Sequence, residues 1–131
     1  MTPTEMIARK LASTRTLTES AKVLENLLSE DCEFLDDGTL VLFGRRHLVE
    51  QLGGLRITIN ANEHPPPHFH VWHQGMDASF LILDCEHLKG NLTERQRRAV
   101  KFWFENSKAL LIGEWNKTRP SNCPVGEFIE P

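Results

Sequence analysis

The sequence predicts an α+β fold in which a small antiparallel sheet of about four or five strands packs against helices. Three observations predict it. Helix-start signals stand near the N-terminus, short alternating apolar runs fill the middle of the chain, and helical apolar stripes follow them. The expected order is an N-terminal helical pair, then the strands, then two C-terminal helices.

Each N-terminal helix is predicted to begin at a capping box. Thr2 stands before Pro3 and three residues before Glu5, so a hydroxyl, a proline and a carboxylate occupy the favoured first positions. Thr16 and Glu19 repeat the hydroxyl and the carboxylate. The apolar residues that follow them at helical spacing are Ala21, Val23, Leu24, Leu27 and Leu28.

Turn residues divide the middle of the chain into short strands. Asp36-Asp37-Gly38 lies between two apolar runs and predicts a β-hairpin, and Gly75-Met76-Asp77 predicts a short connection between two later strands. The expected strands are residues 32–35, 40–43, 55–60, 68–74, 78–83 and 86–92, with a short helix at 45–52.

Two helices are expected at the C-terminal end. Thr93 and Gln96 form a third capping pattern, before a helix with a stripe of apolar and aromatic residues. Ser107 is expected to cap a further helix that carries Trp115. Residues 120–131 are expected to form an irregular tail.

Bulk properties limit the classes of protein. A length of 131 residues fits a single domain over 1–131, and a net charge of −3 gives no whole-molecule attraction to nucleic acid or anionic membrane. Three separated cysteines without a C-x-x-C pair argue against a disulfide framework and a thiolate zinc site. No export signal and no run of roughly 18 apolar residues is present, so we expect a cytoplasmic protein outside the membrane.

The segment 62–70, Asn-Glu-His-Pro-Pro-Pro-His-Phe-His, is the best candidate site, because four of the six histidines lie between residues 64 and 73. The proline run holds the chain extended, which separates the Cα atoms of His64 and His68 by about 12 Å. His68 and His70 alternate on one strand, about 6.7 Å apart, and share a face with Trp72. His68 and His70 are therefore the better pair.

Three interpretations of this segment remain open. Asn62, His64 and the prolines form a rigid turn; or His68 and His70 hold a divalent metal such as zinc; or they act without metal as acid–base or phosphate-binding groups. In a functional site Asn62, Glu63 and His64 are candidate binding residues. A catalytic zinc needs a third protein ligand, and the candidates are Glu63, Asp84, Glu86 and His87.

A basic group and the tryptophans are further candidates. Arg95, Arg97 and Arg98 stand near the start of the third helix, where they either form a solvated face or hold phosphates. Trp103 and Trp115 occupy apolar helical positions typical of the core, whereas Trp72 could stack on a base or another ring.

The motif Asn62–Val71, with Ala78-Ser79-Phe80, Ile82-Leu83-Asp84, Leu88-Lys89-Gly90 and the two helical tryptophans, resembles the bacterial and phage family catalogued as domain of unknown function 4160. The resemblance covers about residues 40–119, and residues 1–39 form an N-terminal extension of helices and one strand.

The resemblance implies that the gene belongs to a mobile element and lies beside genes for other small proteins. That setting suggests a toxin–antitoxin-type or defence-related protein acting on nucleic acid. His68 and His70 would then be the catalytic pair, and the three arginines would hold the backbone. The alternatives are a metal-binding hydrolase that uses His68 and His70, and a non-enzymatic interaction module with a surface of prolines, Phe69 and Trp72.

Overall fold

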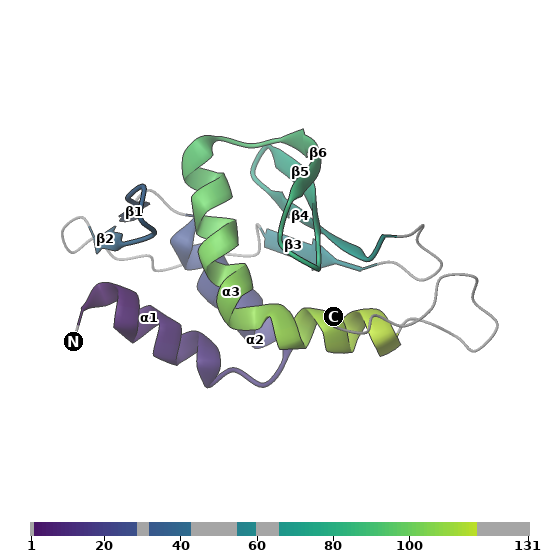
Figure 1. The fold of residues 1–131 in the computed structure, drawn as a ribbon, viewed down its shortest axis with the longest axis horizontal. Helices are drawn as coiled ribbons and strands as arrows, with labels where there is room; N and C mark the ends of the chain where they lie inside the picture. Colours follow the sequence, from purple (N-terminus) through teal and green to yellow (C-terminus); the bar gives the residue numbers. More distant parts are fainter. Residues whose placement is uncertain (1, 29–31, 43–54, 60–65, 118–131) are drawn as a thin grey trace.

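Figure 1 shows the computed structural model, which describes residues 2–28, 32–42, 55–59 and 66–117. In chain order its elements are α1 (Pro3–Ala12), α2 (Leu17–Leu27), β1 (Cys32–Phe34), β2 (Leu40–Leu42), β3 (Leu55–Thr58), β4 (His68–His73), β5 (Met76–Leu81), β6 (His87–Asn91) and α3 (Glu94–Lys117). The α+β class is confirmed. The helix expected at 45–52, the tail 120–131, and Asn62, Glu63 and His64 lie outside the described residues.

Both N-terminal capping boxes are confirmed. The Thr2 hydroxyl accepts a hydrogen bond from the Glu5 amide at 3.1 Å, and the Glu5 carboxylate accepts one from the Thr2 amide at 3.1 Å. Thr16 and Glu19 make the same reciprocal pair at the start of α2. These bonds satisfy amides that the first helical turn leaves without partners, which is why each helix starts where the sequence predicts.

The main sheet has four strands in the order β3-β4-β5-β6, each antiparallel to the next, and β1 and β2 form the predicted hairpin apart from it. The turn between β4 and β5 differs from the prediction. Gln74 and Gly75 both have positive φ, at 39° and 89°, the geometry of a two-residue hairpin turn. Met76 therefore begins β5, where its side chain is 2% exposed.

The expectation of two C-terminal helices is wrong, because α3 runs unbroken through Ser107. Figure 1 shows α3 bending part of the way along its length. Ser107 is buried inside this helix, and its hydroxyl lies 2.5 Å from the hydroxyl of Ser20 on α2. The Ser107 side chain therefore bonds to the neighbouring helix and does not cap a new one. The cap at Thr93 is confirmed, because the Gln96 amide donates a hydrogen bond to the Thr93 hydroxyl at 3.1 Å.

The core lies between the helices and one face of the sheet. Trp103 and Trp115 are fully buried, which confirms their packing role, and the Trp103 indole donates to the Ser20 carbonyl at 2.9 Å. Phe69 lies between Phe80, with ring centroids 5.4 Å apart, and the α3 aromatic rings. In the described residues, no helix is both long and apolar enough to cross a membrane.

Candidate functional site

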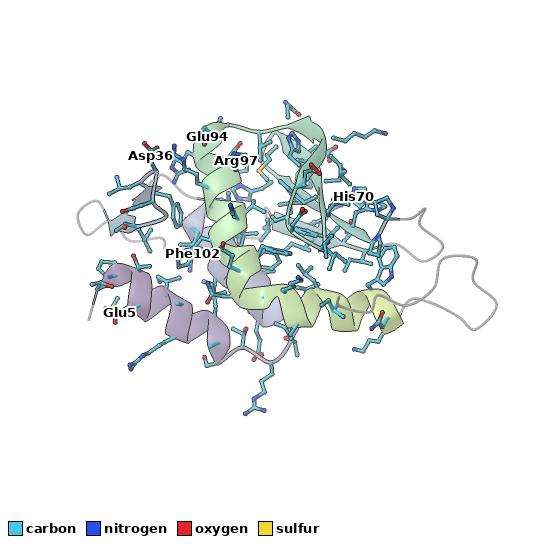
Figure 2. The ribbon with its side chains drawn as sticks, viewed as in Figure 1. Glu5, Asp36, His70, Glu94, Arg97 and Phe102 are labelled. Atoms are coloured by element: carbon cyan, nitrogen blue, oxygen red, sulfur yellow. The ribbon has the colours of Figure 1, made fainter. Side chains whose placement is uncertain are left out.

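Strand β4 presents two different faces. Phe69, Val71 and His73 are buried beneath the helices, whereas His68 and His70 are half-buried and Trp72 is 43% exposed. The predicted sharing of a face by His68, His70 and Trp72 is confirmed. We call the side of the sheet that carries these three residues the outer face. Figure 2 shows His70 on the side of the sheet away from Arg97 and Phe102 of α3.

Strand register adds neighbours from the other strands to the outer face. Paired residues in an antiparallel sheet project to the same side, so each β4 residue stands in a row that crosses the sheet. One row is Arg56, Trp72, Asp77 and Asn91, and the other is Thr58, His70, Ser79 and Lys89. The outer face therefore combines two cations and one carboxylate with aromatic rings and small polar groups.

The imidazoles of His68 and His70 lie close together. Their ring centroids are 5.1 Å apart and their planes are inclined at 69°. Nδ1 of His68 lies 2.8 Å from the Pro66 carbonyl oxygen. A carbonyl only accepts hydrogen bonds, so Nδ1 carries a proton, and in the neutral ring Nε2 is the basic nitrogen. The next carbonyl, that of Pro67, accepts from the Ile82 amide at 3.0 Å and ties the proline segment to the residue after β5.

Trp72 stands beside a cation. The Arg56 guanidinium carbon lies 5.4 Å from the centre of the Trp72 ring, within the range of a cation–π contact. Both side chains are exposed. A flat, solvent-accessible ring beside a cation suits a ligand that combines a planar group with negative charge.

A metal would need ligands beyond the histidine pair. The described residues contain no group of three histidine, cysteine, aspartate or glutamate side chains that could hold an ion. Asp84 accepts from the Glu86 amide at 3.0 Å, and His87 Nε2 lies 2.9 Å from the Lys89 carbonyl. The Asp84 contact lies in the connection into β6, and the His87 contact lies within β6 itself. Glu63, the other candidate third ligand, lies outside the described residues.

The predicted arginines form a separate cluster on α3. Arg97 contacts the Glu94 carboxylate at 2.6 Å, and Arg98 contacts Glu94 at 3.1 Å and Asp36 at 2.5 Å. The hydrogen bond from Arg97 is the main reason that the pKa of Glu94 falls to about 2. Carboxylates of the same chain therefore balance these guanidinium charges, and the structure does not bring them to the histidine pair (Figure 2).

Two of the arginines attach the N-terminal segment to α3. Arg98 donates to the Phe34 carbonyl at 2.8 Å, and Arg95 donates to the Leu28 carbonyl at 3.1 Å. Charged donors on backbone carbonyls form comparatively strong hydrogen bonds. From the sequence these arginines look like a cationic patch, because their partners are backbone carbonyls and no residue type marks such a partner. The structure gives these arginines a role in holding the chain together.

His73 is a buried titratable group on the inner face. Its side chain is 5% exposed, and Nε2 has no hydrogen-bond partner among the described residues. Burial lowers its pKa below the ordinary value of 6.5, and the Glu25 carboxylate opposes part of that effect. The folded protein therefore favours the neutral ring.

We expect this histidine to make folding sensitive to mild acid. The unfolded chain binds a proton at His73 below about pH 6.5, and the folded chain does so only at lower pH, so the free energy of unfolding falls as pH drops through that window. In His73→Phe the fall should be smaller. Urea unfolding at several values between about pH 8 and about pH 5 measures this difference. Equal slopes in the two proteins would show that His73 does not contribute.

Residues Arg56 and Lys89 were missed as members of the site. The alternation of Leu55, Ile57 and Ile59 does place Arg56 on the opposite side of its strand. Which strand lies beside it, and in which register, depends on tertiary pairing and has no short-range signal. Phe69, proposed from the sequence as part of a partner surface, is fully buried and cannot serve in one.

Together these features define a small α+β domain whose antiparallel sheet packs one face against helices and carries His70 and Trp72 on the other. His68 lies at the margin of that face, with its ring centroid 6.2 Å from that of the buried Trp115 on α3. Residues 54–116 match the model of a family described as "Domain of unknown function (DUF4160)". This segment is therefore similar to the DUF4160 family, which confirms the resemblance over β3 to β6 and nearly all of α3. The match is shorter than the expected 40–119. Comparison with curated proteins and with solved structures gave no match.

Proposed function

We propose that the outer face binds single-stranded nucleic acid. The observation that carries this proposal is the exposed Trp72 ring beside Arg56, on the same strand face as two histidines. Single strands are recognised on open sheets by rings that stack on bases and by cations that contact phosphates. Trp72 provides the ring, and Arg56 and Lys89 provide cations in the rows to which Trp72 and His70 belong.

The charge of the chain favours short-range contacts over long-range attraction. The net charge is −3, and Asp77 stands next to Trp72 in its row. An interface with about two cations releases few counterions, so we expect only a shallow dependence of affinity on salt. Stacking then contributes a large share of the binding free energy. Arg97 and Arg98, paired with carboxylates, and Arg95, bonded to the Leu28 carbonyl, are not part of this proposed surface.

The biological setting belongs to the same proposal. In it the chain is a cytoplasmic bacterial protein of a mobile element, of the toxin–antitoxin or defence type, and a small protein encoded nearby is its partner. The DUF4160 match supports this setting only through the gene neighbourhoods that the family resemblance implies.

Removing the Trp72 ring tests the binding proposal. We expect Trp72→Ala to weaken binding of single-stranded RNA or DNA of about 16 nucleotides by roughly 5- to 150-fold, since stacking one base contributes about 1–3 kcal/mol. Fluorescence anisotropy with labelled oligonucleotides measures it. Met6→Ala is the matched control, because Met6 is an exposed apolar side chain (47%) on α1. Binding that is equally tight in both variants would remove Trp72 from the interface.

A metal-binding hydrolase is the second candidate. Metal-ligating histidines commonly donate their other ring N–H to a carbonyl, as His68 does to Pro66. This candidate predicts about one zinc or similar ion per chain by mass spectrometry, lost in the His68→Ala/His70→Ala protein. Absence of stoichiometric metal from the untagged protein, purified without chelator, would reject this candidate.

A further inference from the structure

We propose that the outer face cleaves single-stranded RNA, with His68 as general base and His70 as general acid. This activity rests on the nucleic-acid binding proposed above and assigns RNA as its substrate. The two imidazoles precede Trp72 on the same face of β4, at alternate positions, so a base stacked on Trp72 would bring its phosphodiester towards them.

His68 has the arrangement expected of an oriented base. The hydrogen bond from Nδ1 to the Pro66 carbonyl, at 2.8 Å, and the neighbouring Trp115 ring, with its centroid 6.2 Å away, orient the imidazole. Because Nδ1 carries the proton, Nε2 is the basic nitrogen of the neutral ring. The same carbonyl stabilises the imidazolium that forms, as the orienting group does in catalytic triads. The support is rigid because Pro66 and Pro67 have fixed φ, and the Pro67 carbonyl is bonded to the Ile82 amide.

His70 is placed to act on the same phosphate. The ring centroids are 5.1 Å apart, so the two imidazoles are close enough to act on one phosphodiester. Lys89 belongs to the row of His70, with Ser79 between them. Its ammonium can therefore contact a phosphate oxygen on which negative charge develops.

The reaction balances without a metal or a co-reactant. Nε2 of His68 takes the proton of the ribose 2′-hydroxyl, and the 2′-oxygen attacks the adjacent phosphorus. The bond from phosphorus to the 5′-oxygen breaks, and protonated His70 gives its proton to that oxygen. The products are a 2′,3′-cyclic phosphate and a 5′-hydroxyl. No atom is oxidised or reduced, and the requirement for a 2′-hydroxyl restricts the reaction to RNA.

Cleavage and binding can be measured separately on matched oligonucleotides. The substrate is a single-stranded RNA, and the binding probe is the all-deoxy strand of the same sequence, both with excess chelator. We expect the purified protein to cleave the RNA to cyclic-phosphate ends. His68→Asn and His70→Gln should each lower the cleavage rate about 100- to 10,000-fold, and the deoxy-strand affinity of each variant is measured in parallel so that loss of binding is distinguished from loss of cleavage. In His68→Asn the amide can keep the hydrogen bond to Pro66 but cannot act as a base.

Each of the other outcomes contradicts one stated part of the two proposals. If the protein binds the deoxy strand through Trp72 but leaves the RNA intact, the ribonuclease activity is wrong and the binding function stands. If cleavage needs added metal, or continues at the wild-type rate in both folded histidine variants, the acid–base assignment is wrong. If neither strand binds and RNA is not cleaved, both proposals fail. Circular dichroism and thermal melts establish that each variant is folded.

Discussion

Gly90→Ala is expected to destabilise the sheet severely. Gly90 lies in β6 with φ of +92°, and a Cβ there would stand 1.9 Å from the Asp77 carbonyl oxygen and 2.7 Å from the Ala78 Cα. Both are backbone atoms of β5, which is held between β4 and β6 and cannot move aside. Adding backbone strain to overpacking, we expect a loss of roughly 2–6 kcal/mol in the free energy of unfolding. Chemical denaturation measures it.

Two other glycines provide matched controls. Gly75 has a similar φ of +89° but nothing within 4 Å of an added Cβ, so Gly75→Ala isolates the conformational strain. Gly113 lies in α3, also with open space, and Gly113→Ala should stabilise the helix by about 0.5–1 kcal/mol. If Gly90→Ala costs no more than Gly75→Ala, the close approach of β6 to β5 is not as described.

Deletion of residues 1–42 is expected to abolish cooperative folding. The segment contributes much of the core around Trp103, and its fully or nearly buried apolar residues are Leu11, Val23, Leu24, Leu27, Leu28, Phe34 and Leu40. Its removal also breaks the indole bond to the Ser20 carbonyl and the Arg98 bond to the Phe34 carbonyl. A stability of only about 5–15 kcal/mol cannot withstand these losses together. Calorimetry of the fragment should show no sharp transition.

A point variant tests the same packing with a smaller expected loss of stability. Leu24 is fully buried on α2, and Leu24→Ala should cost about 2–5 kcal/mol. Lys22→Ala, at an exposed position of the same helix, should be close to neutral. A fragment 43–131 that melts cooperatively near the temperature of the full chain would show that the DUF4160 segment folds independently of the N-terminal helices.

Prediction from the sequence succeeded where the signal is local. A hydroxyl three residues before a glutamate or glutamine satisfies helix amides by itself, so Thr2, Thr16 and Thr93 marked true helix starts. The alternation of strand side chains likewise assigned His68, His70 and Trp72 correctly to one face of β4. These features depend on neighbours within a few residues.

The failures involve partners far away in the chain. Ser107 has the residue type of a helix cap, but its hydroxyl contacts Ser20, which is 87 residues earlier, inside the packed core. Arg98 stands among basic residues, yet two of its three partners lie 62 and 64 residues earlier, at Asp36 and Phe34. The orienting carbonyl of Pro66 is a backbone atom, which no residue pattern distinguishes.

The distribution of tryptophans gives the protein a built-in optical probe. The chain contains no tyrosine and three tryptophans, so tryptophan dominates its ultraviolet emission. Trp103 and Trp115 are fully buried, whereas Trp72 is 43% exposed. A water-soluble quencher should therefore dim Trp72 first, and a base that stacks on this ring would shield it. The native chain can in this way report occupancy of the outer face without a label, while the two buried indoles report unfolding in the same cuvette.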